Sequence, residues 1–450
     1  MKKIIHWLSI FLIYFFSAPI HVYAELDRLA LPQGGSVVSG QVDINYAALD
    51  RLNVNQSTNQ AIVNWQSFNV GRDASVHFNQ PTSKASILNN VLSGQSIING
   101  SIYSNGRLFL VNPTGILTGP HSAIKAEGAV LSTLNLSKQN YLDNNLQFNT
   151  NSNSSLVNQG LIEGQYVALI APEVNNKGTI ITSAATTIAA GDDVLLGISD
   201  SNNLTVKVSP SKLQAMAKNE GTIKTQNGIV TITTDAAQSL VDEVVKLPNA
   251  KADGLVSENG VIKLVSNFGS IKAKKIKIDA GSKGATEISG VLNLNNEKGK
   301  GGTIEITGKD IDVNSATITA NGQTGGGSIL IGGDWQGSGD LLQATYLDID
   351  SNSKITANAL TSGSGGTIVA WSDIKNSNSL TKVSGTLEAK GIDGNGGQIE
   401  TSGAVLDING IKVSTSSVTG SYGNWLVDPT NLTIDASAAS TYVTNLASSD

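Results

Sequence analysis

The sequence has no cysteine and few proline, aromatic or charged residues, and the shortages of cysteine and of charge each exclude a class of protein. Without cysteine, neither a disulfide framework nor a thiolate metal site can form. Charged residues make up 15% and the formal net charge is -6, so the basic surface of a nucleic-acid-binding protein is absent. Hydrophobic residues reach 40%, which is enough for a buried core and argues against a disordered chain.

Glycine is abundant by contrast, with 47 residues, and it separates short runs of strand-forming residues. The stretch from Ser86 to Ser137 is the clearest example. Its apolar runs are too short for helices, and Asn-Gly pairs stand between them. Because glycine adopts positive φ without steric cost, these pairs are turn sequences. We predict short stacked strands at Ile97-Ile98, Ser101–Tyr103, Leu108–Val111 and Ile116-Leu117.

Two short patterns repeat along the chain. The first combines asparagine, glycine and isoleucine and has its glycines at Gly160, Gly178, Gly221 and Gly260. These glycines are 18, 43 and 39 residues apart, which we interpret as one, two and two turns of about 20 residues each. The second pattern, a glycine pair, one polar residue and then isoleucine, has its second glycine at Gly302, Gly327, Gly366 and Gly397.

These repeats predict an all-β protein, a right-handed parallel β-helix. Each coil should contain three short sheets, with isoleucine, valine and leucine stacked inside and asparagine or glycine at the corners. Two segments break the strand pattern, Pro210–Asn219 and Asp235–Leu247, because they place apolar residues among good helix formers. We predict short helices on the flank of the solenoid for both, with a partner-binding amphipathic helix as the alternative.

Three short motifs follow one another between residues 64 and 115. The first, NWQSFNVG, contains Trp65 and Phe68, and the second, LNNV with a following glycine, contains Asn89 and Gly94. The third is formed by Asn112, Pro113, Thr114 and Gly115. In this order they resemble the W-x-x-F-x-I-G, LN-x-V-x-x-G and NPNG motifs of filamentous haemagglutinin-type exoproteins, the secreted partners of two-partner secretion in Gram-negative bacteria. Val70 and Thr114 depart from the usual isoleucine and asparagine.

The resemblance implies a domain organisation. Residues 1–24 would be a signal peptide, 25–253 the secretion domain and 254–450 a β-helical repeat stem. In the family, strands corresponding to the stretch from Glu25 to about Arg51 form an N-terminal cap, which protects the first open edge. The segment from Gly423 to Ile434 resembles one that follows the stem in large adhesins, and no cap pattern comes after it. We therefore expect a chain truncated at its C-terminus.

The resemblance also implies partners. Family members pass through a dedicated outer-membrane β-barrel whose periplasmic domains capture the unfolded secretion domain, and the stem then serves adhesion to a host-cell protein or glycan. Delivery of a toxin or scavenging of haem are alternatives for the same first 250 residues. The four residues of the third motif are candidates for transporter recognition, or for folding of the turn alone. Trp65, Phe68, Asn89 and Gly94 are expected to anchor the early coils.

The N-terminus predicts the route of export. Lys2 and Lys3 precede an apolar run from Ile4 to Ile20, and cleavage is expected between Ala24 and Glu25. This is the pattern of a Sec signal peptide, which leads to the periplasm and, in this family, to the cell surface or medium. A membrane anchor is the alternative, although the run has marginal length and ends in a processing site.

Enzymes are the remaining alternative, because polysaccharide lyases and hydrolases also use parallel β-helices. The best candidate is Gly191-Asp192-Asp193, since paired carboxylates can activate a water molecule. The G-H-G and R-I-K segments that accompany it in polygalacturonases are missing, so we interpret it as a polar corner. Beyond the signal peptide only His77 and His121 remain, and neither has a neighbouring second ligand. We predict a protein that is not an enzyme, with no cofactor and no metal.

Overall fold

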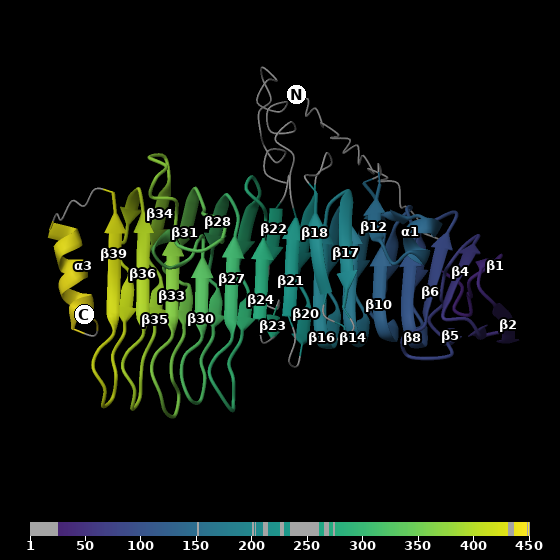
Figure 1. Ribbon diagram of the computed structural model, residues 1–450, viewed down its shortest axis with the longest axis horizontal. Helices are drawn as coiled ribbons and strands as arrows, with labels where there is room; N and C mark the ends of the chain where they lie inside the picture. Colours follow the sequence, from purple (N-terminus) through teal and green to yellow (C-terminus); the bar gives the residue numbers. More distant parts are fainter. Residues whose placement is uncertain are drawn as a thin grey trace, which may run out of the picture.

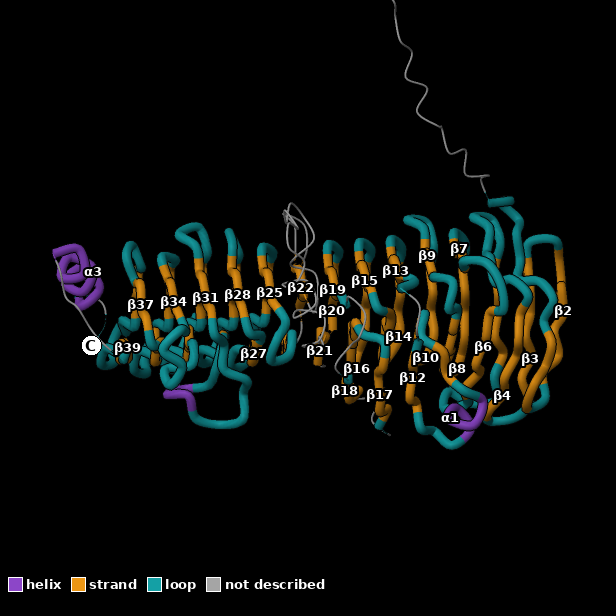
Figure 2. The backbone as a smooth tube through the Cα atoms, turned by 90° about the horizontal axis from the view of Figure 1, so that it is seen from above, coloured by secondary structure: helices purple, strands orange, loops and turns teal. Residues whose placement is uncertain are grey.

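A computed structural model describes residues 26–450 except 151–152, 200–201, 203, 210–214, 226–228, 235–260, 265–269, 273–274, 431–435, 448 and 450. The chain winds into a long solenoid whose strands stack in parallel along one axis (Figures 1 and 2). This confirms the predicted class of fold, a parallel β-helix. Two stacks of strands merge into one large sheet, and a third forms a separate sheet of 11 strands.

Four consecutive coils combine the two merged stacks in single long strands, β8, β10, β14 and β16, whereas the coils on either side have a separate strand for each stack. The four longest, β8 to β16, pair over the whole of their length and bend where their register shifts, for example between Ala126 and Gly128. The large sheet begins with β3 (Arg51–Gln56), β4 (Gln60–Trp65), β5 (Ser75–Asn79), β6 (Ser86–Val91), β8 (Ser101–Val111), β10 (Ala123–Ser132), β14 (Leu161–Ala171), β16 (Thr179–Ala190), β20 (Thr222–Thr225) and β21 (Ile229–Thr234).

Beyond β21 the two stacks are separate in every coil. The stack that continues β20 consists of β23 (Ser270–Lys272), β26 (Val291–Asn293), β29 (Thr317–Thr319), β32 (Lys354–Thr356), β35 (Thr386–Glu388) and β38 (Lys412–Ser414). The stack that continues β21 consists of β24 (Lys275–Asp279), β27 (Thr303–Thr307), β30 (Ser328–Ile331), β33 (Thr367–Trp371), β36 (Gln398–Gly403) and β39 (Asn424–Pro429).

The third stack runs almost the full length of the solenoid. Its strands are β7 (Ser96–Ile98), β9 (Ile116–Thr118), β13 (Ser155–Asn158), β15 (Glu173–Asn176), β19 (Met216–Asn219), β22 (Val261–Leu264), β25 (Ala285–Ile288), β28 (Asp310–Val313), β31 (Tyr346–Ile349), β34 (Leu380–Val383) and β37 (Val405–Asp407). Together the three stacks give the three short sheets per coil that the repeats predict.

The core is formed by apolar side chains that occupy the same position in successive coils. In a strand every second side chain faces inward, so one isoleucine per repeat is enough to build a continuous column. Ile304, Ile329, Ile368 and Ile399 stand in register in adjacent strands, and each has 0% exposure. Asparagines stack at one corner, where the Asn158 side-chain amide donates to the Asn176 side-chain oxygen and that of Asn176 to Asn219. The nitrogen–oxygen distance is 2.7 Å in both hydrogen bonds. These ladders satisfy buried amides that an apolar neighbour would leave unpaired.

The ends of the solenoid are covered by different elements. At the N-terminal end, β1 (Ser36–Ser39) and β2 (Val42–Ala48) pair antiparallel with β4 and β3, which agrees with the expected cap. At the other end, α3 (Ala436–Leu446) lies against the last coil (Figure 1). Asn445 accepts a hydrogen bond from the Val413 amide over 2.6 Å and donates to the Ile411 carbonyl over 3.2 Å. The sequence pattern did not predict this helix.

A small antiparallel sheet lies outside the solenoid. It consists of β11 (Asn135–Leu136), β12 (Leu146–Asn149), β17 (Asp193–Ile198) and β18 (Leu204–Val208), and α1 (Lys138–Leu142) connects the first two strands. Its apolar side chains form a second core over the long strands, with Tyr141 and Phe148 buried in it. Gly191-Asp192-Asp193 is a corner between β16 and β17, and Gln147 donates to the Asp193 carboxylate. The interpretation as a polar corner therefore agrees with the structure.

The turn count that the asparagine repeat suggested is wrong. The strands β15 and β19 are direct neighbours, so the 43 residues between Gly178 and Gly221 form one coil and not two. The extra length leaves the solenoid as β17 and β18. β22 likewise follows β19 directly, and Ile262 pairs with Ala217 and not with Ile223, so the fourth copy of the pattern is out of register. Spacing alone cannot tell a coil from a coil with an excursion.

Of the two predicted helices, the one over Pro210–Asn219 is wrong at its described end, and the one over Asp235–Leu247 is not tested. Met216–Asn219 is strand β19, because its alternating side chains continue the third stack. Residues 210–214 of the first segment lie outside the described residues, and so does the whole of Asp235–Leu247. The helices within the described residues are α1, α3 and the short 3-10 turn η1 (Trp335–Gly337).

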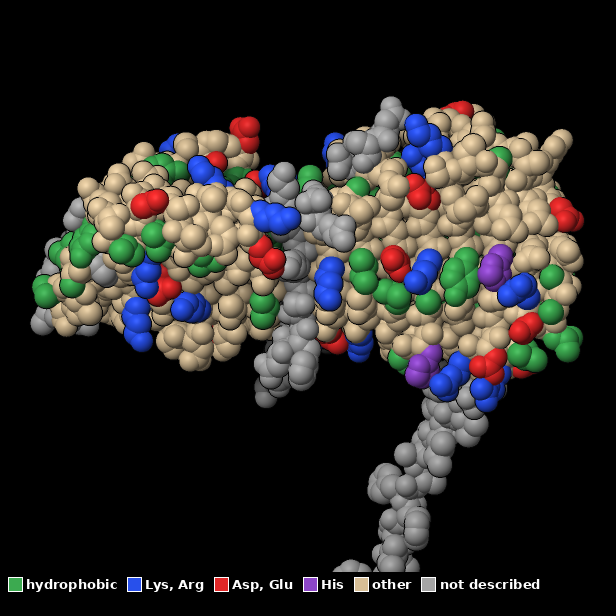
Figure 3. Space-filling view, turned by 90° about the horizontal axis from the view of Figure 1, so that it is seen from below, with side chains coloured by type: hydrophobic (Ala, Val, Ile, Leu, Met, Phe, Trp, Pro, Cys, Tyr) green, Lys and Arg blue, Asp and Glu red, His purple; other side chains and the backbone are tan. Residues whose placement is uncertain are grey.

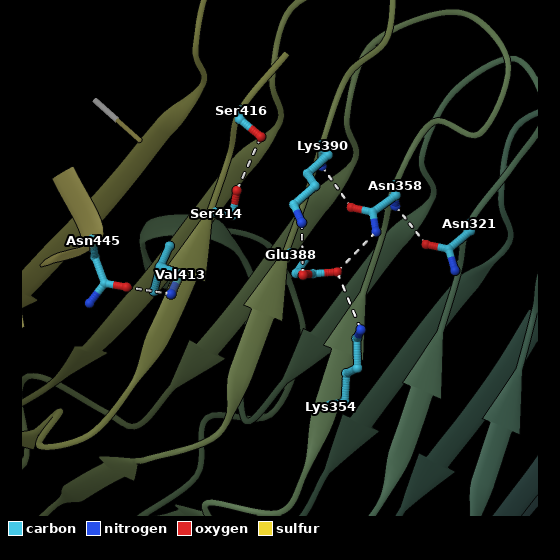
Figure 4. Close-up of polar contacts among 9 residues, drawn as sticks. All are labelled: Asn321, Lys354, Asn358, Glu388, Lys390, Val413, Ser414, Ser416 and Asn445. Atoms are coloured by element: carbon cyan, nitrogen blue, oxygen red, sulfur yellow. Dashed lines mark hydrogen bonds and ion pairs between the residues drawn. The ribbon is translucent and has the colours of Figure 1, made fainter. Parts of the chain in front are cut away.

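Glu388 provides a test of how the coils are held together by charge (Figure 4). Its carboxylate lies 2.8 Å from the Lys390 ammonium and 3.6 Å from that of Lys354 on the adjacent coil. Burial alone would raise the pKa of Glu388, but the hydrogen bond and charge of Lys390, together with the charge of Lys354, outweigh it and lower the pKa.

We expect Glu388→Gln to lower the melting temperature at pH 7 and to have little effect at pH 3. A carboxyl whose pKa is lowered in the folded state stabilises the fold above its unfolded pKa, and this contribution is lost as the pH falls through the folded value. The melting temperatures of the wild type and of Glu388→Gln are measured between pH 3 and 7. A difference in melting temperature that stays constant over this range would contradict the lowered pKa of Glu388. Asp407→Asn, a change in the third stack away from these lysines, is the control.

Candidate functional site

The predicted four-residue motif forms the turn between β8 and β9. Asn112 is completely buried, Pro113 is half-buried and Thr114 is exposed. Gly115 has φ of +120°, a conformation that favours glycine. The motif therefore presents one side chain to solvent, while its asparagine points into the molecule.

Asn112 joins two coils through its side chain. Its amide nitrogen donates to the Gly94 carbonyl over 2.9 Å and to the Ser96 hydroxyl over 2.8 Å. Its amide oxygen accepts from the Thr114 backbone N–H over 2.9 Å, which is the geometry of an Asx turn. Both ends of the amide are therefore satisfied, as a buried polar group requires.

Thr114 replaces the family's usual asparagine without opening the turn. Its hydroxyl lies 2.7 Å from the Asn112 side-chain oxygen and 3.0 Å from the Gly94 carbonyl. Its φ is not positive, because Gly115 takes the unusual conformation. A short hydroxyl side chain is thus compatible with this turn.

The two upstream motifs meet in the preceding coils. The Trp65 indole nitrogen donates to the Asn89 side chain over 2.9 Å, and Asn89 donates in turn to the Phe109 carbonyl over 3.1 Å. Phe68 packs edge-on against Trp65, with ring centroids 5.6 Å apart and planes at 86°. The side chains of Trp65, Phe68 and Asn89 are each at most 1% exposed, so they build the core and offer no surface to a partner.

The three motifs lie in successive coils along one corner of the solenoid. The Leu92 amide donates to the Trp65 carbonyl over 2.8 Å, and Gly94, two residues further on, receives the bond from Asn112. We call the exposed residues of this column the motif corner: Leu92, Ser93, Gly94, Gln95 and Thr114. Leu92 is 56% exposed, so the motif corner presents one apolar side chain to solvent. Sequence reasoning did not select it, although an apolar residue between Val91 and Ser93 was the available signal.

We expect Trp65→Phe to lower the free energy of unfolding by about 2 kcal/mol. The smaller ring leaves a cavity, and the Asn89 oxygen loses its buried donor. Denaturant unfolding measures the change. Trp425→Phe is a matched control, because that indole also donates to a side chain, Thr401, but is 9% exposed in the last coil. An equal loss in both variants would contradict a special anchoring role for Trp65.

Other candidate sites find no support in the described part of the chain. It contains no group of three or more histidine, cysteine or acidic side chains that could hold a metal ion. His77 and His121 lie in different surface hollows. The predicted cleavage site, Ala24 and Glu25, lies outside the described residues. Among the described residues no helix has the length and apolar character needed to cross a membrane.

Comparisons with known proteins add an independent line of argument. Residues 30–278, more than half of the chain, match the family model described as TPS secretion domain. The crystal structure of the HMW1 secretion domain from Haemophilus influenzae is similar, with a TM-score of 0.73, 27% identity and coverage of 88% of this chain and 100% of that one.

Two curated proteins are similar in sequence. Both are heme/hemopexin-binding proteins of Haemophilus influenzae, each 26% identical, over 309 and 319 residues. The matches cover 63% of this chain in both cases, but only 33% and 34% of the relatives. The chain thus spans about a third of the length of the curated relatives that it matches.

Proposed function

The chain belongs to the family of TPS secretion domains, and on this premise we propose that its motif corner and N-terminal coils direct export through a cognate outer-membrane transporter of the two-partner type. A β-barrel with periplasmic capture domains is the partner that the family implies. A signal peptide at 1–24 would bring the chain to the periplasm, and the coils from 254 to 450 would be displayed at the surface as a non-enzymatic stem for adhesion.

The observation that carries this proposal is the arrangement of the motif corner. The family's motifs are buried where they stabilise coils, and their exposed residues are Gln66, Leu92, Ser93, Gly94 and Thr114. A transporter that binds the chain before it folds can contact all of these residues. After folding only the exposed edge remains available, so release of the chain is coupled to the formation of the corner.

Folding outside the cell would then favour forward movement. At about 0.05–0.15 kcal/mol per residue, a coil of about 20 residues contributes on the order of 1–3 kcal/mol, several times RT. Neighbouring coils contact each other mainly through segments that follow one another in sequence, so they can fold in order from the first coil outward. Each coil that folds outside opposes backsliding.

Haem scavenging is a second candidate, favoured by the names of the two curated relatives. Haem scavenging and adhesion are alternative functions of the exported protein. Titration of the purified chain with haem and with hemopexin distinguishes them: saturable binding favours scavenging, and adherence of labelled protein to host cells without such binding favours adhesion. A toxin-delivery role would require an effector region in addition.

Export itself is tested by expression with and without a cognate outer-membrane transporter of the two-partner type. We expect the chain in the medium or on the surface only when the transporter is present, because a chain of this size does not cross the outer membrane unaided. A chain exported equally well without the transporter would rule out the two-partner route. Its control is a version without residues 1–24, which should remain in the cytoplasm in both strains.

A further inference from the structure

A groove on the side of the first coils is not explained by export. It has a volume of about 640 Å³ and runs across five parallel strands, β5, β8, β10, β14 and β16. Neighbouring strands are about 4.8 Å apart, so five strands give a length of about 19 Å along the solenoid axis. Figure 3 shows the molecule from below, with a row of histidine, apolar and charged side chains across the coils.

One wall of the groove is a ladder of side chains in register. His77 pairs with Tyr103, Tyr103 with Lys125 and Lys125 with Glu163. The rings of His77 and Tyr103 stack with centroids 5.0 Å apart, and Tyr103 is 39% exposed. This wall therefore offers aromatic and aliphatic surface beside hydrogen-bonding groups.

A second row of lining side chains, two residues further along the same strands, is rich in amides, which neighbouring coils hold in place. Asn79 donates to Asn55 over 2.8 Å and Asn105 to the Gln80 carbonyl over 2.8 Å. Gln165 donates to the Glu127 carboxylate. Because these groups are already ordered, a ligand would not bear the entropic cost of fixing them.

Charge and backbone pairing decide between classes of ligand. Lys125 is paired with Glu163 over 3.1 Å, and Glu127 adds a further carboxylate, so the groove has no positive excess for an anionic polymer. Its floor consists of strands that are paired on both sides, which leaves no free edge where an extended peptide could add as a strand. Burial and the charge of Arg51 lower the pKa of His77, which favours a neutral wall.

We propose that this groove binds a linear, uncharged oligosaccharide, with Tyr103 against the apolar face of a sugar ring and the amides of Asn79, Asn105 and Gln165 hydrogen-bonded to its hydroxyls. Amides both donate and accept, as hydroxyls do. An open groove about 19 Å long by the strand spacing above suits a chain of sugars better than a single one. The proposal goes beyond export and does not depend on it.

The test uses the purified chain and four defined probes: cellohexaose, maltohexaose, xylohexaose and chitohexaose. Isothermal titration is expected to detect binding of at least one, and Tyr103→Ala should weaken it at least tenfold. His121→Ala is the control, since that exposed histidine lies in a different hollow. If Tyr103→Ala unfolds at the same temperature as the wild type, its weaker binding reflects a lost contact with the sugar and not a lost fold. Gln165→Ala provides a second variant if Tyr103→Ala does not fold.

Three outcomes would overturn the proposal. No binding of any of the four hexasaccharides at millimolar concentration is the first. Equal binding by wild type, Tyr103→Ala and Gln165→Ala is the second, because the sugar would then lie elsewhere. The third is tighter binding of hexagalacturonate than of every uncharged probe, which would contradict the charge argument. Failure of export in cells would leave all three measurements intact, so the two proposals fail separately.

Discussion

Gly178→Ala is expected to destabilise the folded chain by about 3 kcal/mol and to reduce export severely. A Cβ at this position would lie 2.1 Å from the carbonyl oxygen of Gly160 on the preceding coil. Backbone atoms cannot rotate away as a flexible side chain can. The coils would have to separate at this corner, and the hydrogen bonds between them would lengthen.

The same column continues to the next coil, so the effect is not peculiar to one residue. A Cβ on Gly221 would lie 2.0 Å from the Gly178 carbonyl oxygen. Denaturant unfolding gives the loss of stability, and pulse-labelled export through the transporter gives the loss of rate. If folding outside the cell drives translocation, both must fall together.

Gly410→Ala is the matched control for that experiment, because Gly410 lies outside the motif corner. Gly410 has a conformation that favours glycine, with φ of +82°, but a Cβ there would meet only the Ser384 Cβ, at an ordinary contact distance of 3.9 Å. Only local backbone strain of about 1–2 kcal/mol is expected. Normal export of a Gly178→Ala protein that has lost its stability would contradict the proposed coupling of folding and export.

Asn112→Ala is expected to cost about 3 kcal/mol in the free energy of unfolding and to abolish most export. The change leaves the Ser96 hydroxyl and the Gly94 carbonyl without a donor from the amide, and it opens the Asx turn to Thr114. Chemical unfolding measures the first effect and the amount of protein in the medium the second.

Two surface variants separate recognition of the motif corner from its folding. Leu92→Ser and Thr114→Ala alter exposed side chains and should change the free energy of unfolding by less than about 1 kcal/mol. If the transporter binds this edge, Leu92→Ser lowers export although the protein folds normally. Normal export of Leu92→Ser and loss of export only in Asn112→Ala would mean that the motif acts through folding alone.

The amino-acid sequence by itself determined the class of fold and the identity of the motif residues. Isoleucine at a fixed place after each glycine pair specifies an inward column, because side chains alternate along a strand. Asparagine beside glycine specifies a corner for the same local reason. The buried roles of Trp65 and Phe68 also follow from local pattern, since large apolar side chains in a strand-rich chain are buried.

Only the tertiary structure decided which coils are neighbours. The 43 residues between Gly178 and Gly221 fit two turns by length, yet β15 and β19 pair directly. The excess forms β17 and β18 because its apolar side chains find a second core with Tyr141 and Phe148, far away in sequence. Such packing depends on contacts that no local pattern contains.

The same reason explains what was missed at the site and at the end of the chain. The link between Asn112 and Gly94 crosses from one coil to the next, so the sequence identifies both residues but not their bond. The docking of α3 rests on Asn445 meeting the edge of β38, 32 residues away. Local sequence thus determines which elements form, whereas stacking between coils determines which residues meet.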